Sequence, residues 1–255
     1  MGRVIAISNQ KGGVGKTTTA INLSACLAEK GKRVLTIDMD PQGNTTSGLG
    51  IDKSTVEHTS YQLLTNETTI WEAMTPSIVP GLSVIASERS LAGAEIELIG
   101  VEDREFILKK EVDKVRDNYD FVIIDCPPSL NTLTVNAMTT ADTVLVPIQC
   151  EYYALEGLSE LIYTIELVKE RLNNKLEIEG VVFTMYDSRT NLSMQVVENV
   201  KSHLNQKVFK TLIPRNIRLA EAPSYGQPIN MYDSKSAGAE AYMSLAEEVI
   251  NRKED

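Results

Sequence analysis

A glycine- and lysine-rich stretch near the start of the chain has the residue types of a phosphate-binding loop. Residues 9–19 read NQKGGVGKTTT, and they lie between the apolar run RVIAIS (3–8) and a helical pattern over 17–30. The glycines let successive backbone N–H groups face an anion, and the following helix adds the positive end of its dipole. Because a strand, a glycine-rich turn and a helix follow in this order, a merely flexible turn is a poor alternative. The residues predicted to bind the phosphates are Gly12, Gly13, Val14, Gly15, Lys16, Thr17 and Thr18.

The polar side chains of this loop have separate predicted roles. Lys16 is expected to reach the β- and γ-phosphates, Thr17 to ligate Mg²⁺ and Thr18 to contact the α-phosphate. The pattern G-x-x-x-x-G-K-[ST] is not met in full, since Gln10 stands where the first glycine belongs. Lys11, at the entrance of the loop, is a second cation that the pattern does not explain. A solvated lysine beside a turn is the alternative.

Three aspartates stand at or just after the ends of predicted strands. Asp38 ends one apolar run, Asp40 follows it, and Asp125 ends another. Because ligands of open α/β sheets gather at the carboxyl ends of the strands, we expect these carboxylates near the phosphate loop. Asp125 is predicted to hold Mg²⁺ through water, since this hard ion keeps much of its hydration. For each of the three, a carboxylate that caps a neighbouring turn or helix is the alternative.

The elements that position these residues are visible in the hydrophobic pattern. Short apolar runs without polar alternation predict strands covered on both faces, as in a parallel sheet between helices. The runs are 3–8, 33–38, 82–87, 120–125, 143–148 and 180–185, and helical periodicity is found at 17–30, 103–117, 154–172, 191–204 and 237–251. This alternation predicts an α/β fold with a single doubly wound, mostly parallel sheet flanked by helices, in one domain over 1–255. Residues 44–81, rich in Thr and Ser, are expected to be mostly loop.

Composition limits the classes of protein. The chain has 255 residues and a formal charge of −10, so its overall field opposes non-specific binding to DNA or anionic lipid. Cys26, Cys126 and Cys150 show no metal-ligand spacing and are expected to be reduced thiols of a cytoplasmic protein. No apolar run approaches the ~20 residues of a membrane span. We therefore expect no membrane segment.

The charge is unevenly distributed. Residues 189–235 hold seven basic residues against three acidic ones, in a chain that is acidic as a whole. Such a segment predicts a surface for DNA phosphates, and a solvated basic face is the alternative. The candidate DNA-binding residues are Arg189, Lys201, Lys210 and Arg218.

Several motifs together resemble one family. KGGVGKTT (11–18) is similar to the deviant Walker A motif of the ParA/MinD family of ATPases, and the small chromosomal ParA/Soj type matches best. The resemblance continues over essentially the whole chain in DMDPQGNTTSGLG (38–50), DFVIIDCPPSL (120–130), PIQCEYYALEGL (147–158) and TLIPRNIRLAEAPSYGQPI (211–229). It implies ATP and Mg²⁺ as cofactors and a slow, partner-stimulated ATPase.

The resemblance also implies roles for residues of the phosphate site. In the family, the early lysine crosses a dimer interface to the partner's phosphates, so Lys11 is expected to act in trans and, with Lys16 and Asp40, to form the catalytic set. Asp40 is expected to position or activate the attacking water, with Asp38 near the magnesium shell. The predicted metal residues are thus Thr17, Asp38 and Asp125.

More distant residues are implied in the same way. Met185, Pro214 and Asn216 are candidates for adenine contacts, with a loop proline and a turn asparagine as the alternative. Glu151 is expected to face the partner's ribose, or else to serve a helix N-terminus. Arg189 matches the position of the family's DNA-contacting arginine.

The resemblance implies an ATP-dependent chromosome or plasmid partitioning protein of the cytoplasm and nucleoid. An ATP-bound homodimer would bind double-stranded DNA non-specifically, and a ParB-type partner would stimulate hydrolysis and restore the monomer. The alternative is a membrane-associated division-site regulator similar to MinD, but the acid-rich tail SLAEEVINRKED (244–255) is unlike a basic lipid anchor. Iron–sulphur proteins would need paired cysteines, and amide-forming enzymes would need a substrate pocket that the sequence does not reveal.

Overall fold

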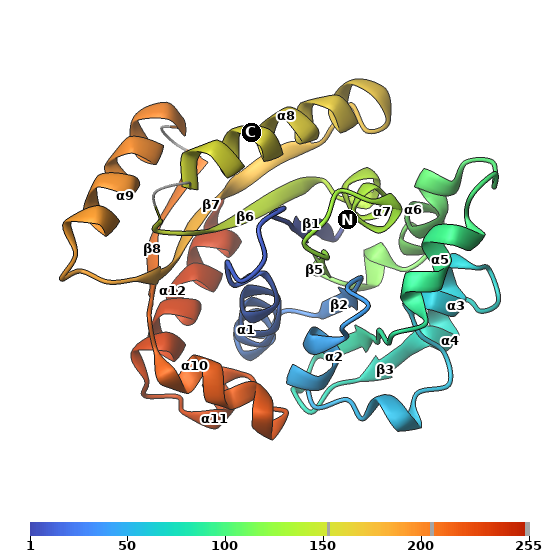
Figure 1. Ribbon diagram of the computed structural model, residues 1–255. Helices are drawn as coiled ribbons and strands as arrows, with labels where there is room; N and C mark the ends of the chain where they lie inside the picture. Colours follow the sequence, from blue (N-terminus) through green and yellow to red (C-terminus); the bar gives the residue numbers. More distant parts are fainter. Residues whose placement is uncertain (152–153, 205–206, 253–255) are drawn as a thin grey trace.

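One mixed sheet forms the centre of the molecule (Figure 1). The computed structural model describes residues 1–151, 154–204 and 207–252. The strand order is β3-β4-β2-β5-β1-β6-β7-β8, and all neighbours are parallel except the antiparallel pair β3–β4. The strands are β1 (Arg3–Ile7), β2 (Val34–Asp38), β3 (Met74–Pro76), β4 (Leu82–Ile85), β5 (Phe121–Asp125), β6 (Thr143–Gln149), β7 (Glu177–Tyr186) and β8 (Val208–Pro214).

Helices connect the strands and cover both faces of the sheet. They are α1 (Lys16–Glu29), α2 (Asn44–Gly48), α3 (Ser60–Leu64), α4 (Ile70–Ala73), α5 (Leu91–Glu97), α6 (Ile107–Val112), α7 (Thr132–Thr140), α8 (Ala154–Arg171), α9 (Asn191–Leu204), α10 (Ile217–Glu221), α11 (Ile229–Tyr232) and α12 (Ala237–Asn251). Short 3-10 turns lie at Lys53–Thr55, Arg104–Phe106, Arg116–Asn118 and Ala222–Tyr225.

Two hydrophobic cores lie on opposite faces of the sheet. In β1, Val4 and Ala6 belong to the core under helices α3 to α9, while Ile5 and Ile7 belong to the core under α1 and α12. Figure 1 shows α8 on one side of the sheet and α1 with α12 on the other. Because successive side chains of a strand point to opposite faces, a strand between two helical layers must be apolar throughout. This explains the continuous apolar runs of the sequence.

The predicted fold class is confirmed, and so are the six predicted strands within a few residues at their ends. Strands β3 and β8 were not predicted. That residues 1–255 form one domain stays a prediction, although every strand of the described chain belongs to one sheet.

The predicted helix over 103–117 is wrong in its extent. The structure has a 3-10 turn, the six-residue helix α6 and a second 3-10 turn over this stretch. Arg116 explains the break, because its buried guanidinium donates to the Gly2 carbonyl and to the Asp142 carboxylate at 2.8 and 2.7 Å. These contacts attach the second 3-10 turn to the residues just before β1 and β6.

Residues 44–81 are also more ordered than expected. They contain α2, α3, α4 and β3 besides a 3-10 turn. Thr59 and Thr69 begin α3 and α4 with complete capping boxes, in which Gln62 and Glu72 are the reciprocal partners. Such caps stabilise helices too short for periodicity to reveal.

Among the helices described, none combines the length and the apolar character that crossing a bilayer requires.

Candidate active site

The phosphate loop connects the carboxyl end of β1 to the first residue of α1. Gly13 and Gly15 have φ values of 74° and 88°, a left-handed conformation that side chains with a Cβ atom rarely adopt. Lys16 then begins α1, so the loop's N–H groups and the helix N-terminus face the same space. The predicted strand, turn and helix are therefore confirmed as a local structure.

The Lys16 side chain contacts the backbone at the entrance of its own loop. Its ammonium Nζ donates to the Lys11 carbonyl oxygen at 2.9 Å, and the residue is only 6% exposed. Burial lowers the pKa of this ammonium, while the nearby carboxylates of Asp125 and Asp40 raise it. Lys16 thus lies between the loop and the carboxylates, where a triphosphate would be neutralised.

Two contacts outside the loop hold its backbone. The Thr184 hydroxyl on β7 donates to the Val14 carbonyl at 2.8 Å, and both residues are buried. On the other side, the Asn9 amide donates to the Pro147 carbonyl at 2.8 Å and accepts the backbone N–H of Lys11 at 2.9 Å. The loop is therefore fixed from β6 and β7 as well as from its own ends.

Asp125 ends β5 beside Asp38 of β2, since the parallel register of these strands pairs the two residues. Both are fully buried. One Asp125 oxygen, Oδ2, accepts the Thr45 hydroxyl at 2.6 Å, whereas Oδ1 is buried with no hydrogen-bond partner among the described residues. The pKa of Asp125 is raised to about 8, mainly by burial and then by the neighbouring Asp38 charge, against the side chains of Thr45 and Thr17, which lower it.

Asp38 and Asp40 lie on the same side of the loop. Asp38 Oδ2 accepts the backbone N–H and the hydroxyl of Thr46 at 2.8 and 2.7 Å, and its Oδ1 accepts the backbone N–H of Asp40 at 3.1 Å. Burial raises the pKa of Asp38 to about 6. Asp40 is 9% exposed as a residue, and its carboxylate accepts the backbone N–H of Gln42 at 2.9 Å.

The residues present fit a magnesium ion. A buried carboxylate oxygen of Asp125 without a partner and the hydroxyl of Thr17 beside it are the hard donors that Mg²⁺ prefers. In the part of the chain that the structure describes, no group of three His, Cys, Asp or Glu side chains is arranged to hold a metal.

Lys11 and Glu151 meet within one chain. Lys11 Nζ lies 3.4 Å from Glu151 Oε2, and the two side chains are 40% and 50% exposed. The family resemblance implies that each of these two residues contacts the nucleotide of a partner subunit. Both stand at the entrance of the phosphate loop, Glu151 just after β6. Tyr152 and Tyr153 of the quoted motif lie outside the described residues.

The adenine candidates come from two neighbouring strands. Met185 lies near the end of β7 with a φ of 49°, and Pro214 ends β8, where it pairs in register with Tyr186. The Asn216 side-chain oxygen accepts the backbone N–H of Arg218 at 2.8 Å and caps α10. This hydrogen bond agrees with the alternative interpretation, in which the Asn216 side chain forms a turn.

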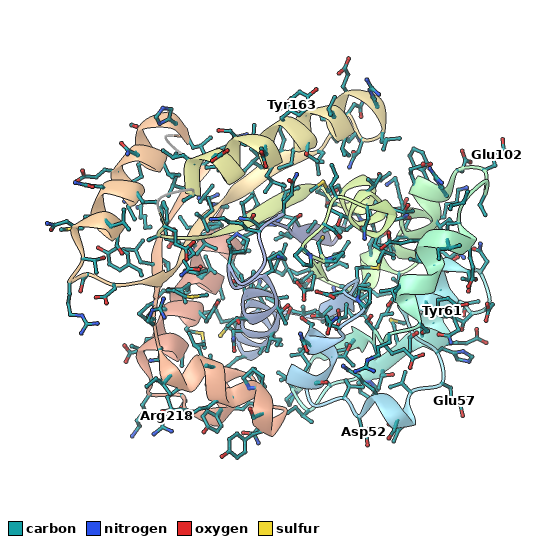
Figure 2. All side chains as sticks on the ribbon, viewed as in Figure 1. Asp52, Glu57, Tyr61, Glu102, Tyr163 and Arg218 are labelled. Atoms are coloured by element: carbon teal, nitrogen blue, oxygen red, sulfur yellow. The ribbon has the colours of Figure 1, made fainter. Side chains whose placement is uncertain are left out.

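The DNA-binding candidates lie along one side of the molecule but on separate elements. Arg189 precedes α9, Lys201 is on α9, Lys210 on β8 and Arg218 on α10, and Figure 1 shows these elements on the same side. All four are exposed, and Figure 2 shows Arg218 at the outer margin of α10. Two of the charges are already paired.

Arg189 forms a two-fold contact with Asp187, Nε to Oδ1 at 2.9 Å and Nη2 to Oδ2 at 2.7 Å. Arg218 contacts Glu221 at 2.9 Å.

Four functional neighbours were not predicted from the sequence. They are Thr45 and Thr46, which donate to the carboxylates, Thr184, which donates to the phosphate loop, and Ser87, which donates to the Asp40 carbonyl. Two of them stand in the quoted stretch DMDPQGNTTSGLG, so the signal was a pair of hydroxyl residues a few positions after two aspartates. Ser87 and Thr184 come from β-strand ends far away in the chain, and only the fold brings them there.

A phosphate loop that leads into a helix beside carboxylates at the carboxyl edge of a parallel sheet defines a P-loop NTPase. The family described as "AAA domain" matches residues 2–178. The chain is 57% identical over 249 residues to the sporulation initiation inhibitor protein Soj of Bacillus subtilis, with 98% of each chain covered. It is 54% identical over 255 residues to the chromosome partitioning protein ParA of Caulobacter vibrioides, with 99% and 96% covered. The chain therefore belongs to the ParA/Soj group of the ParA/MinD family of ATPases.

Among solved structures, cobyrinic acid a,c-diamide synthase from Mycobacterium smegmatis with a bound ATP analogue and magnesium is similar. Its TM-score is 0.86 at 37% identity, and the match covers 98% of this chain and 95% of that one. A nucleotide and magnesium are thus found in a protein with this fold.

Proposed function

We propose that this protein is an ATP-dependent partitioning ATPase that acts on chromosomes or plasmids. The observation that supports it most is the meeting of the phosphate loop with Asp125, which keeps one buried oxygen unpaired beside Lys16 and Thr17. The relatives named for chromosome partitioning extend over nearly the whole chain at 54% identity. The two together connect a nucleotide site with a biological role.

ATP and Mg²⁺ are the proposed cofactors. Lys16 and the loop N–H groups would bind the phosphates, and Thr17 and Asp125 would hold the ion, which supplies charge neutralisation. Asp40, which is largely buried next to the loop, would orient the attacking water. Phosphoryl transfer needs mainly positioning and charge neutralisation, and these residues would supply the part that comes from one chain.

A dimer would complete the site. Lys11 is 40% exposed at the loop entrance, where a second molecule can reach it. A cation supplied in trans is worth about 10³–10⁵ in rate when it is correctly placed. Lys11 would therefore link hydrolysis to pairing, and nucleotide would decide whether the chain is a monomer or a dimer.

The dimer would bind DNA phosphates without sequence preference and would associate with the nucleoid. Two copies of the basic side formed by Arg189, Lys201, Lys210 and Arg218 would bind one DNA molecule together, which can raise affinity ~10²-fold. A ParB-type partner would stimulate hydrolysis and return the protein to a free monomer in the cytoplasm.

Size-exclusion chromatography of Asp40→Ala with ATP, with and without DNA, tests this function. The variant should bind ATP, elute as a dimer and co-elute with DNA, while the same protein with ADP should elute as a free monomer. Elution as a monomer with ATP bound would contradict the proposal.

An ATP-dependent amide-forming enzyme is a second candidate, because the similar solved structure is named as a cobyrinic acid diamide synthase. The higher identity to partitioning proteins favours the first candidate. Phosphate release that depends on cobyrinic acid and an ammonia donor would support the second. The MinD-like alternative predicts pelleting with anionic liposomes in ATP rather than with DNA; residues 253–255 of the tail lie outside the described residues.

A further inference from the structure

Four residues at the carboxyl edge of the sheet form a closed ring of hydrogen bonds around the backbone of Asp40. Asp38 Oδ1 accepts the Asp40 backbone N–H at 3.1 Å, and the Asp40 carbonyl accepts the Ser87 hydroxyl at 2.7 Å. The Ser87 backbone N–H donates to the Thr46 hydroxyl oxygen at 2.8 Å, and this hydroxyl donates to Asp38 Oδ2 at 2.7 Å. We define Asp38, Asp40, Thr46 and Ser87 as the Asp40 ring.

The ring is shielded from water. Asp38, Thr46 and Ser87 have no exposed surface, and Asp40 is 9% exposed. Hydrogen bonds in such an environment are stronger than in water, and an unmade one is costly. The peptide groups on both sides of the Asp40 Cα atom are therefore held, and its carboxylate accepts the Gln42 backbone N–H.

Ser87 joins two parts of the chain that the sequence keeps apart. It follows β4 and lies 47 positions after Asp40, and its hydroxyl is the only link of the ring that reaches the Asp40 carbonyl from outside residues 38–46. Within those residues, only the Gly43 backbone N–H also donates to this carbonyl, at 2.8 Å. The Ser87 hydroxyl thus fixes residues 38–46 against the end of β4.

We propose that Ser87 and Thr46 are positioning residues for ATP hydrolysis, which act by holding Asp40 where it orients the attacking water. The inference rests on the proposed function, because it assumes that Asp40 serves hydrolysis. Neither residue needs to touch nucleotide. Their loss should lower the rate of the chemical step and leave ATP binding nearly unchanged, since a small displacement of a catalytic group can cost about 10²-fold in rate.

Ser87→Ala tests the proposal most directly, because it removes one hydroxyl and keeps the Ser87 N–H in the ring. We expect kcat for ATP hydrolysis to fall about tenfold or more, with KM and the affinity for a fluorescent ATP analogue within about twofold of wild type. Ser24→Ala is the matched control: Ser24 is also fully buried and accepts the Thr36 hydroxyl at 2.8 Å, but it takes part in no hydrogen bond of the ring. Both variants should lower the melting temperature similarly, and only Ser87→Ala should lower kcat.

Thr46 gives an independent pair of variants. Thr46→Val keeps the shape and removes the hydroxyl, so it breaks two links of the ring and should also lower kcat more than tenfold. Thr46→Ser restores the hydroxyl and should return kcat to within about threefold of wild type. If a general structural defect lowered kcat, restoring only the hydroxyl in Thr46→Ser would not restore kcat.

The outcomes separate this inference from the proposed function. Wild-type protein that releases no phosphate from Mg-ATP would overturn both. If wild type hydrolyses ATP, Asp40→Ala does not, and both Ser87→Ala and Thr46→Val keep wild-type kcat, only the positioning role is wrong.

Discussion

Lys11 and Glu151 form an ion pair within one chain, with Nζ and Oε2 3.4 Å apart at the mouth of the phosphate loop. Exposed pairs of this kind contribute ~0–1 kcal/mol, so a stronger anion can replace the carboxylate easily. A triphosphate on a second molecule is such an anion. In the dimer that we propose, the pair would therefore hold Lys11 near the position from which it acts in trans, at little cost to dimerisation.

Lys11→Ala should separate ATP binding from turnover. The variant should bind ATP as a monomer, because Lys16 and the loop remain, but should neither dimerise nor hydrolyse. Phosphate release measured against protein concentration checks this: wild-type specific activity should rise with concentration. A Lys11→Ala variant whose turnover equals wild type at all concentrations would exclude the trans role.

Gly12→Val should block pairing without disturbing the fold. A Cβ atom at Gly12 would meet nothing within 4 Å among the described residues, and Gly12 is not among the residues of positive φ. The Cβ atom of the new side chain therefore has room within the chain, and we attribute the expected loss of pairing to contact with a second molecule. The variant should melt like wild type and bind ATP, yet light scattering should show only monomers.

Gly13→Val is the contrasting variant, since Gly13 has a φ of 74°. A left-handed residue with a Cβ atom costs about 1–2 kcal/mol, so this change should deform the loop and weaken ATP binding itself. If Gly12→Val formed ATP-dependent dimers at the protein concentrations at which wild type dimerises, the placement of Gly12 at the dimer interface would be refuted.

How well the sequence predicts the residues of the site depends on how far apart these residues lie along the chain. Lys16, Thr17 and the glycines act through a local loop, so their spacing alone indicates their place. Asp38 and Asp125 are more remote, but the rule that ligands gather at strand ends brings them together. Ser87 and Thr184 follow no such rule, because an isolated buried hydroxyl has no signature in a sequence until its partner is known.

The prediction of secondary structure has a similar limit. The strands were predicted because burial on both faces leaves a continuous apolar run, as in Phe121–Asp125. Helix α7 was missed because its sequence TLTVNAMTT is rich in β-branched residues of weak helix propensity. Its cap, in which Asn131 accepts the backbone N–H of Thr134, and its burial against the sheet compensate for that propensity.

Asp187 should restrain DNA binding by occupying Arg189. The two-fold contact holds the pKa of the Asp187 carboxyl well below its usual value, so the acid stays charged and competes with DNA phosphate. Asp187→Asn should therefore raise DNA affinity several-fold and steepen the salt dependence by about one phosphate contact. Arg189→Glu should do the opposite, and retention on DNA over a salt series measures both.

Asp120→Asn controls for the change in net charge. Asp120 forms a similar exposed pair with Arg33, with Nη2 and Oδ1 3.2 Å apart, away from the basic side. It should alter DNA retention far less than Asp187→Asn. Equal gains from both substitutions would mean that net charge, and not Arg189, governs the affinity.

Thr184→Val should weaken nucleotide binding through the loop backbone. The Thr184 hydroxyl is the donor to the Val14 carbonyl, and valine fills the same volume without it. Leaving a buried carbonyl without its donor costs about 1–3 kcal/mol, so the melting temperature should fall. Because Val14 lies between two glycines, the released loop should also lose ATP affinity about fivefold or more. Thr36→Val removes an equally buried hydroxyl bonded to Ser24 in the core, and it should reduce stability without changing ATP affinity. Titration with a fluorescent ATP analogue distinguishes the two, and unchanged affinity in Thr184→Val would show that the loop holds its shape without β7.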